Sequence, residues 1–271
     1  MTDEEIRILK QQKKRQIKCE LFHDNLQNYK RYHIPKAQLI IADIPYNLGV
    51  QAFASNPMWY VGGDNRNGES EHAKSAFFNG DGDFNLHEYF HFCGKMLIKE
   101  PKEKNKAPCM VVFCAFEQMA PLIDVAKQNG YEHYIPLFFI KNYSAQVLKA
   151  NMKIVGATEY ALLFYREKLP KFNNNGRMVF NWFRWERDGK DVPKIHPTQK
   201  PVRVLKELIS VLTEPGDVVI DPVAGSGSTL RAARELGRNA YGFEVSTKFY
   251  KEAVEKMLAE TDQIGMGFEW T

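Results

Sequence analysis

The chain has 271 residues, of which 44% are hydrophobic and 26% charged, and its net charge at pH 7 is +4. The length permits one large domain or two modest ones, and the composition is that of a globular protein, which excludes fibrous and disordered classes. No apolar run approaches the roughly 18 residues that a membrane-spanning helix needs, and the first residues lack the apolar block of a signal peptide. We therefore expect a cytoplasmic protein without a membrane partner, whose slight positive charge permits a polyanionic partner but does not require one.

The cysteines offer no sign of a metal site. None of the four forms a C-x-x-C pair, which argues against a zinc knuckle. Three of them stand among apolar neighbours in the sequence. We expect buried free thiols in a reducing compartment, and no metal.

The first third of the chain predicts a helix, two strands and a long loop. Residues 5–15 are typical of a charged helix, and residues 17–23 of a strand that runs into Asp24. The run AQLIIAD, residues 37–43, is continuously apolar and ends in an acid, which is typical of a strand buried on both faces. Residues 52–82 are rich in Gly, Asn and Ser, and loops of that length are usually functional or disordered.

The rest of the chain alternates strands with helices. The elements expected are a helix over 86–100, a strand over 107–116, a helix over 117–130, strands over 134–141 and 159–167, an irregular segment over 168–195, a helix over 200–216 stopped by Pro215 and Gly216, a strand over 217–222, a helix over 228–237, a strand over 239–245, and a helix over 246–260 capped by Ser246. This alternation predicts an α/β fold with a mostly parallel sheet and helices on both faces.

The stretch DVVIDPVAGSGSTL predicts a ligand loop between a strand and a helix. The strand ends at Asp221, and Gly225 and Gly227 would let the backbone approach a ligand closely. No lysine follows Gly227 as in a P-loop, and the third glycine of a nicotinamide fingerprint is missing. Glu244, at the end of the next strand, is placed to accept bonds from ribose hydroxyls. The pattern favours adenosylmethionine as cofactor, although the loop taken alone also fits a structural turn.

Two further stretches are ambiguous when taken singly. In DIPY, Asp43 and the carbonyl of Ile44 could accept the two N–H bonds of a base amine, while Pro45 stiffens the turn and Tyr46 stacks on the base. The same four residues also fit an ordinary turn. HPTQKP, residues 196–201, is either a proline-rich helix start or a cofactor-binding loop.

Basic and aromatic residues alternate between 166 and 194. Such a mixture suits phosphates and stacked bases, and a solvated loop over aromatic side chains is the alternative. The candidates for nucleic-acid contact are Lys141, Arg177, Trp182, Arg184, Trp185 and Arg187.

DIPY, HPTQKP and DPVAGSGST, in this order, resemble the beta-group DNA amino-methyltransferases, which methylate adenine N6 or cytosine N4. The resemblance spans residues 17–260 and implies a Rossmann-like sheet in circularly permuted order with an inserted target-recognition region. It further implies one catalytic domain in three parts: residues 1–140 with the catalytic motif, 141–195 for target recognition, and 196–271 for cofactor binding.

The resemblance also assigns roles to residues. Asp43, Ile44, Pro45 and Tyr46 would hold a flipped base. The expected S-adenosylmethionine contacts are Asp24, His196, Pro197, Thr198, Gln199, Lys200, Asp221, Pro222, Gly225, Ser226, Gly227 and Glu244. Asp24 enters this set because the strand over 17–23 would complete the permuted sheet beside the strand that ends at Glu244.

The expected reaction is methylation of adenine N6 in DNA, because the catalytic motif begins with Asp. Cytosine N4, RNA, a protein amide, or an inactive DNA-binding relative are the alternatives. The family usually has proline where this chain has Ile44, which predicts a looser turn. A homodimer and a cognate restriction endonuclease are further possible partners.

Overall fold

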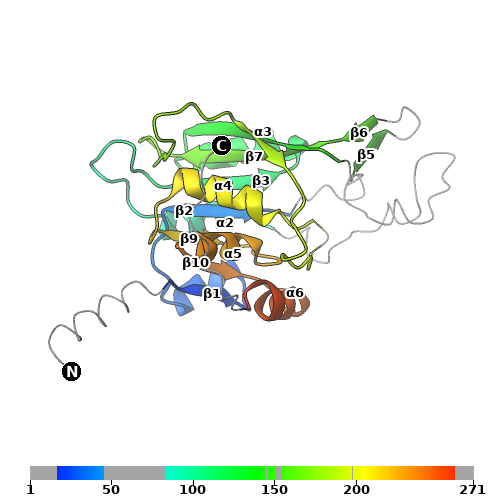
Figure 1. Ribbon diagram of the computed structural model, residues 1–271. Coiled ribbons are helices and arrows are strands. Elements are labelled where there is room, and N and C mark those ends of the chain that lie inside the picture. Colours follow the sequence, from blue (N-terminus) through cyan, green and yellow to red (C-terminus); the bar gives the residue numbers. More distant parts are fainter. Residues whose placement is uncertain (1–16, 46–83, 144–145, 150–153, 197, 260–271) are drawn as a thin grey trace, which may run out of the picture.

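A computed structural model describes residues 17–45, 84–143, 146–149, 154–196 and 198–259. The helix expected over 5–15, the loop over 52–82, Tyr46 and Pro197 lie outside these residues. The strands of its main sheet are β1 (Cys19–Phe22), β2 (Leu39–Asp43), β3 (Cys109–Cys114), β4 (His133–Lys141), β7 (Thr158–Tyr165), β8 (Trp182–Trp185), β9 (Val218–Asp221) and β10 (Asn239–Phe243). They form an eight-stranded sheet in the order β1-β10-β9-β2-β3-β7-β4-β8 (Figure 1).

The main sheet is mostly parallel, as the sequence predicts. Among its described strands, β7 is the one that runs antiparallel to both of its neighbours, β3 and β4. The pairs on either side of this strand are parallel. The carboxyl ends of β2, β9, β10 and β1 therefore lie along one edge of the sheet, and the start of β7 lies at that same edge.

The first described strand completes the sheet beside the last one. β1 pairs in parallel with β10, and the backbone N–H of Ala240 donates to the carbonyl of Lys18 at 2.8 Å. This pairing is the closure that a circularly permuted order requires, and it brings Asp24 next to the strand that precedes Glu244.

Helices cover both faces of the sheet. The helices are α2 (Leu86–Met96), α3 (Met119–Gln128), α4 (Val202–Leu212), α5 (Ser228–Glu235) and α6 (Thr247–Glu252), with 3-10 turns at Leu26–Arg31 and Phe116–Gln118 and a π turn at Ala253–Met257. Figure 1 shows α4 and α5 in front of the sheet. Their apolar side chains share one core cluster with Val111 and Phe113 of β3, whereas α2 and α3 share the other with Met110 and Val112. Alternate side chains of one fully buried strand thus serve two cores.

Several predicted elements differ from the structure, among them the helix expected over 86–100, which ends at Met96. The segment 168–195, expected to be irregular, contains β8, whose alternation of exposed and buried residues over WFRW is typical of a half-buried edge strand. A separate hairpin of β5 (Gln146–Lys149) and β6 (Ile154–Gly156) was missed, and Figure 1 shows it projecting from the main sheet. α4 ends at Leu212, before Pro215, because Thr213 adopts an extended backbone and its hydroxyl donates to the carbonyl of Ile209 at 2.5 Å.

The region from 141 to 195 is therefore partly integral to the main sheet, since it supplies β7 and β8. Its role in target recognition stays a prediction. None of the helices in the described ranges is long and apolar enough to cross a membrane.

Candidate active site

The turn after β2 begins the DIPY motif that is predicted to be catalytic, and we call it the catalytic turn. Two hydrogen bonds hold its described residues. The N–H of Ile44 donates to the carbonyl of Phe113 at 3.3 Å, which extends the β2–β3 ladder by one residue. The side-chain amide of Gln118 donates to the carbonyl of Pro45 at 3.0 Å. A proline in place of Ile44 would have no N–H to give. Ile44 is 2% exposed and adds a bond to the sheet, so its position is well anchored, and the looser turn that we expected from this departure stays a prediction.

Asp43, the last residue of β2, forms an ion pair with the lysine of the HPTQKP segment. Lys200 Nζ lies 2.5 Å from Asp43 Oδ2, and the lysine side chain is 7% exposed. Burial alone would lower the pKa of Lys200, but the carboxylates of Asp43 and Glu159 outweigh this effect, so its pKa lies above the ordinary value. Lys200 is therefore charged at pH 7 and joins two motifs that are far apart in the chain.

Glu159 is a largely buried acid of this site that the sequence analysis missed. It is the second residue of β7, and its Oε1 lies 2.5 Å from Nζ of Lys141 while its Oε2 lies 3.9 Å from Nζ of Lys200. The signal in the sequence was an acid near the start of an otherwise apolar strand, TEYALLFY. Lys141, expected at the DNA surface, has a side chain that is 7% exposed and is used in this ion pair.

The glycine loop after β9 has the backbone that a close approach requires. Gly225 and Gly227 have φ values of 51° and 76°, in the left-handed region that glycine adopts without strain. The N–H of Gly225 donates to Glu244 Oε2 at 2.8 Å, and the N–H of Ser246 donates to Glu244 Oε1 at 2.6 Å. Burial raises the pKa of Glu244 despite these bonds. Loop and acid are thus in direct contact, as a nucleoside site on this loop needs.

Asp221 lies between the glycine loop and the catalytic turn. Its side chain is almost fully buried, and Oδ1 accepts a hydrogen bond from the N–H of Val223 at 3.1 Å. Burial raises the pKa of Asp221 to about 7, although hydrogen bonds from Thr229 and Val223 oppose the shift. A cation placed beside this carboxyl would favour its charged form. The ammonium of a bound amino acid moiety, such as the methionine part of S-adenosylmethionine, would be such a cation.

Residues 196 and 198–201 lie beside the catalytic turn, which Lys200 contacts through Asp43. Nδ1 of His196 lies 3.0 Å from Oγ1 of Thr198, and the imidazole centroid lies 4.4 Å from the ring of Phe249. Burial, with the charge of Lys200, lowers the pKa of His196 to about 4, so the imidazole is neutral at pH 7. Gln199 holds the loop by accepting from the N–H of Ile195 at 3.0 Å.

Asp24 stands at the correct edge of the sheet, but its carboxylate is engaged by its own loop. It accepts from the amide of Asn28 at 2.6 Å and from the hydroxyl of Tyr32 at 2.7 Å. These bonds, with one from the backbone of Asn25, lower the pKa of Asp24. Contact with the cofactor stays a prediction for this residue, as it does for every other residue expected at the cofactor site.

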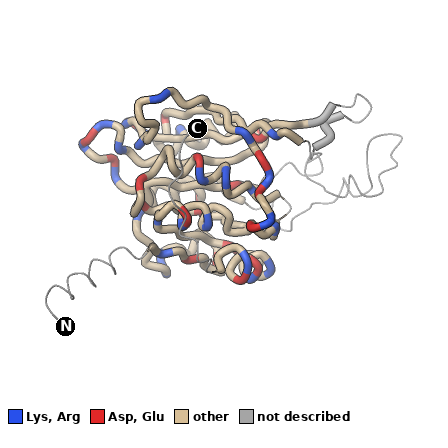
Figure 2. Tube along the Cα trace, in the orientation of Figure 1, with Lys and Arg blue, Asp and Glu red and all other residues tan. Residues whose placement is uncertain are grey.

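The residues expected to contact DNA differ in exposure. Trp182 is 43% exposed and stacks on Phe180, whereas Trp185 is buried and donates its indole N–H to the hydroxyl of Tyr143 at 3.1 Å. This burial favours a supporting role for Trp185 over direct contact. Arg187 lies 4.0 Å above the ring of Tyr143. Figure 2 shows acidic and basic residues interspersed along the chain.

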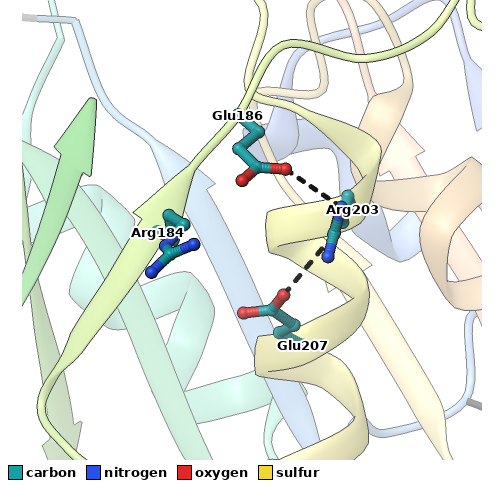
Figure 3. Close-up of a pocket in the computed structure, with 4 residues that line it drawn as sticks. All are labelled: Arg184, Glu186, Arg203 and Glu207. Carbon is teal, nitrogen blue, oxygen red and sulfur yellow. Dashed lines mark hydrogen bonds and ion pairs between the residues drawn. The ribbon is translucent and has the colours of Figure 1, made fainter. Parts of the chain in front are cut away.

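Arg177 and Arg184 lie on the surface outside the buried ion pairs. Arg177 is exposed in the loop before β8. Arg184 lines a hollow between β8 and α4 together with Glu186, Arg203 and Glu207, where Arg203 pairs with Glu186 at 3.0 Å (Figure 3). DNA contact by these residues stays a prediction.

The sequence and fold match known methyltransferases. The sequence model of the family described as DNA methylase, for N6 and N4 enzymes, matches residues 37–255. DNA adenine methyltransferase YhdJ of Escherichia coli (strain K12) is 27% identical over 251 residues, which cover 86% of this chain and 80% of YhdJ. Other curated relatives are matched over 22–63% of their own length.

Two solved structures share the fold. M1.HpyAVI in complex with SAM has a TM-score of 0.60 at 21% identity, covering 87% of this chain and 98% of that one. The cytosine-N4-specific PvuII DNA methyltransferase has a TM-score of 0.61 at 15% identity, covering 90% and 88%. The Rossmann-like fold predicted from the motifs is thus confirmed. With most of its length matched by the family model, this chain belongs to the DNA methylase family of N6 and N4 methyltransferases.

Proposed function

We propose that this protein transfers a methyl group from S-adenosylmethionine to N6 of adenine in DNA. The observation that carries the proposal is the meeting of three motifs at one sheet edge: Asp43 ends β2, Lys200 of the HPTQKP segment pairs with it at 2.5 Å, and Asp221 opens the glycine loop after β9. The charge of Asp221 and that of Lys200 influence each other, as the pKa of Lys200 indicates. The coarser function, DNA methyltransferase that uses S-adenosylmethionine, follows from family membership.

The chemistry asked of the protein is chiefly positioning. When bound, S-adenosylmethionine would supply an activated methyl group: the nitrogen lone pair of the base would form the N–C bond as the C–S bond breaks toward sulfur, and the N–H proton would pass by way of the Asp43 carboxylate to solvent. Asp43 would accept one N–H of the amine and the carbonyl of Ile44 the other, which aims the lone pair at the methyl group. Gln118 and the Ile44–Phe113 bond keep this turn in place.

The cofactor would be held by the other end of the same edge. Glu244, now bonded to two backbone N–H groups, would accept from the ribose hydroxyls, and Gly225 and Gly227 would allow close approach. Asp221 would face the ammonium of the methionine part. Thr198 and Lys200 would close over this site from the segment before α4.

Adenine is favoured over cytosine by the aspartate that begins the catalytic motif and by the alignment with YhdJ, which is named an adenine enzyme. Cytosine N4 is the second candidate, because the PvuII enzyme, named as N4-specific, shares the fold. Arg177, Trp182, Arg184 and Arg187 would bind the DNA backbone and bases around a flipped target. A homodimer, a restriction partner and a cytoplasmic location stay predictions.

Transfer of labelled methyl to DNA tests the proposal. Wild type should label duplex or single-stranded DNA, and nucleoside digestion with mass spectrometry should give N6-methyladenine. Asp43→Ala should reduce the rate by at least roughly 100-fold, because the group that orients the amine is lost. The control is its affinity for S-adenosylmethionine, which should stay within about tenfold of wild type.

The alternatives give different outcomes in the same assay. N4-methylcytosine in the digest would transfer the assignment to cytosine. Label in RNA or protein but not in DNA, or no label in any substrate, would refute the proposal.

A further inference from the structure

Four charged side chains form a chain of alternating sign beneath the catalytic turn. Asp43 Oδ2 lies 2.5 Å from Lys200 Nζ, which lies 3.9 Å from Glu159 Oε2. Glu159 Oε1 in turn lies 2.5 Å from Lys141 Nζ. The side chains of Lys200, Glu159 and Lys141 are 7%, 16% and 7% exposed, and that of Asp43 is 30% exposed. The most exposed member of this chain of charges is therefore Asp43, the carboxylate that the proposed reaction uses.

Topology explains why these residues meet. β2 and β4 end at the edge of the sheet where the active site lies, and they contribute Asp43 and Lys141. β7 runs antiparallel to its neighbours, so its second residue, Glu159, reaches the same edge from the opposite direction. Lys200 arrives from the segment before α4. A parallel strand at the position of β7 would have placed its first residues at the far edge.

The aromatic surroundings strengthen the electrostatic interactions among these four side chains. Lys200 Nζ lies 5.3 Å from the ring centroid of Phe113 and 5.8 Å from that of Trp185, and Lys141 Nζ lies 5.2 Å from the Trp185 ring. Aromatic walls keep water away, and in such an environment one unbalanced charge is felt strongly by its neighbours. The two acids and two lysines balance each other.

We propose that Glu159 is a positioning residue for methyl transfer, which holds Lys200 between two carboxylates and keeps the four-residue chain electrically neutral, so that Asp43 stays available to the incoming amine. The inference rests on the proposed function, and it deepens that function at the same site. Glu159 acts through Lys200 and has no direct role with the base. Trp185 contributes the aromatic wall that both lysines share.

The physical reason lies in where positive charge appears. The amine nitrogen of the base becomes more positive as its new bond forms, and Asp43 is the acid that ends β2 at this turn. Without Glu159, the four-residue chain would carry a net charge of +1, and Asp43, with a weaker contribution from Asp221, would be left to balance Lys200. Lys200 would then interact more strongly with Asp43 and compete with the amine for its carboxylate. The excess positive charge would also oppose the positive charge that develops on the amine and the binding of a cationic cofactor.

Glu159→Gln tests the inference, with Glu235→Gln as the matched control. Glu235, the last residue of α5, is 14% exposed and pairs with Arg231 and Lys206, so it is also a buried acid between two cations. We expect Glu159→Gln to lower kcat by roughly 10- to 100-fold and to weaken S-adenosylmethionine binding in calorimetry by roughly 3- to 10-fold, with KM for DNA nearly unchanged. Glu235→Gln should leave all three close to wild type.

A second variant separates charge from shape. Adding Lys141→Met to Glu159→Gln removes the surplus cation and restores neutrality, so both kcat and cofactor affinity should recover toward wild type. If Glu159 were merely structural, the double variant would be worse than the single one. Glu159→Gln values equal to those of Glu235→Gln, or a double variant that is no better than the single one, would overturn the inference.

Failure of the proposed function is a distinct result. An inactive wild type would count against methyl transfer to DNA, and the cofactor affinities of the same three variants would still decide the role of Glu159.

Discussion

At the scale of single residues, Asp221 carries a conflict between stability and binding. Its folded pKa of about 7 exceeds that of an unfolded aspartate, so between pH 4 and 7 the folded chain binds a proton that the unfolded chain does not. The free energy of unfolding therefore falls as pH rises through this window, by roughly 4 kcal/mol in total for this group. The unbound protein is therefore less stable at neutral pH, and a cation bound beside the carboxylate would offset this loss.

Asp221→Asn should therefore stabilise the unbound protein and weaken the cofactor. In urea unfolding, the variant should gain on wild type by roughly 1 kcal/mol per pH unit between pH 5 and 7, since asparagine has no proton to lose. S-adenosylmethionine should bind it at least roughly tenfold more weakly at pH 8. A stability difference that is constant over this pH range would contradict the raised pKa.

At the scale of elements, the β2–β3 ladder decides how the catalytic turn is built. Ile44→Pro removes the N–H that donates to Phe113, together with a buried side chain. We expect a loss of roughly 2–4 kcal/mol in urea unfolding, whereas Ile44→Val, which keeps the N–H, should cost roughly 1 kcal/mol. A proline variant as stable as the valine variant would mean that the ladder bond contributes nothing.

Elements with strong patterns were predictable from the sequence, and contacts between distant segments were not. The apolar run that ends in Asp43 and the glycine loop after Asp221 were found because strand and turn chemistry are local. β8 was missed because its four residues lie in a polar, irregular stretch, and its pairing with β4 is a tertiary contact. Glu159 was missed because it reaches the site only if β7 is antiparallel to its neighbours, and no local pattern in the sequence indicates the direction of a strand.

At the scale of the whole molecule, the site draws on both ends of the chain. The catalytic turn follows β2, while the glycine loop and Glu244 follow β9 and β10, and β9 lies between β10 and β2 in the sheet. A ligand held at β9 and β10 therefore rests on interior strands of a sheet whose two faces are covered by separate cores. If the sheet unfolds as one unit, ligand binding at this edge must stabilise the distant strand β8 equally.

S-adenosylmethionine at about 100 times its dissociation constant should raise the free energy of unfolding by about 2.7 kcal/mol, or roughly 5–10 °C in Tm. Far-UV circular dichroism reports on the whole fold, and fluorescence reports on Trp182 and Trp185 of β8 once Trp59 and Trp270 are replaced by phenylalanine. Both signals should shift by the same amount, and Glu244→Gln should reduce the shift while Glu235→Gln preserves it. A fluorescence midpoint that does not change when the ligand is added would show that β4 and β8 unfold separately from β9 and β10. The sheet would then consist of two cooperative units joined at β7.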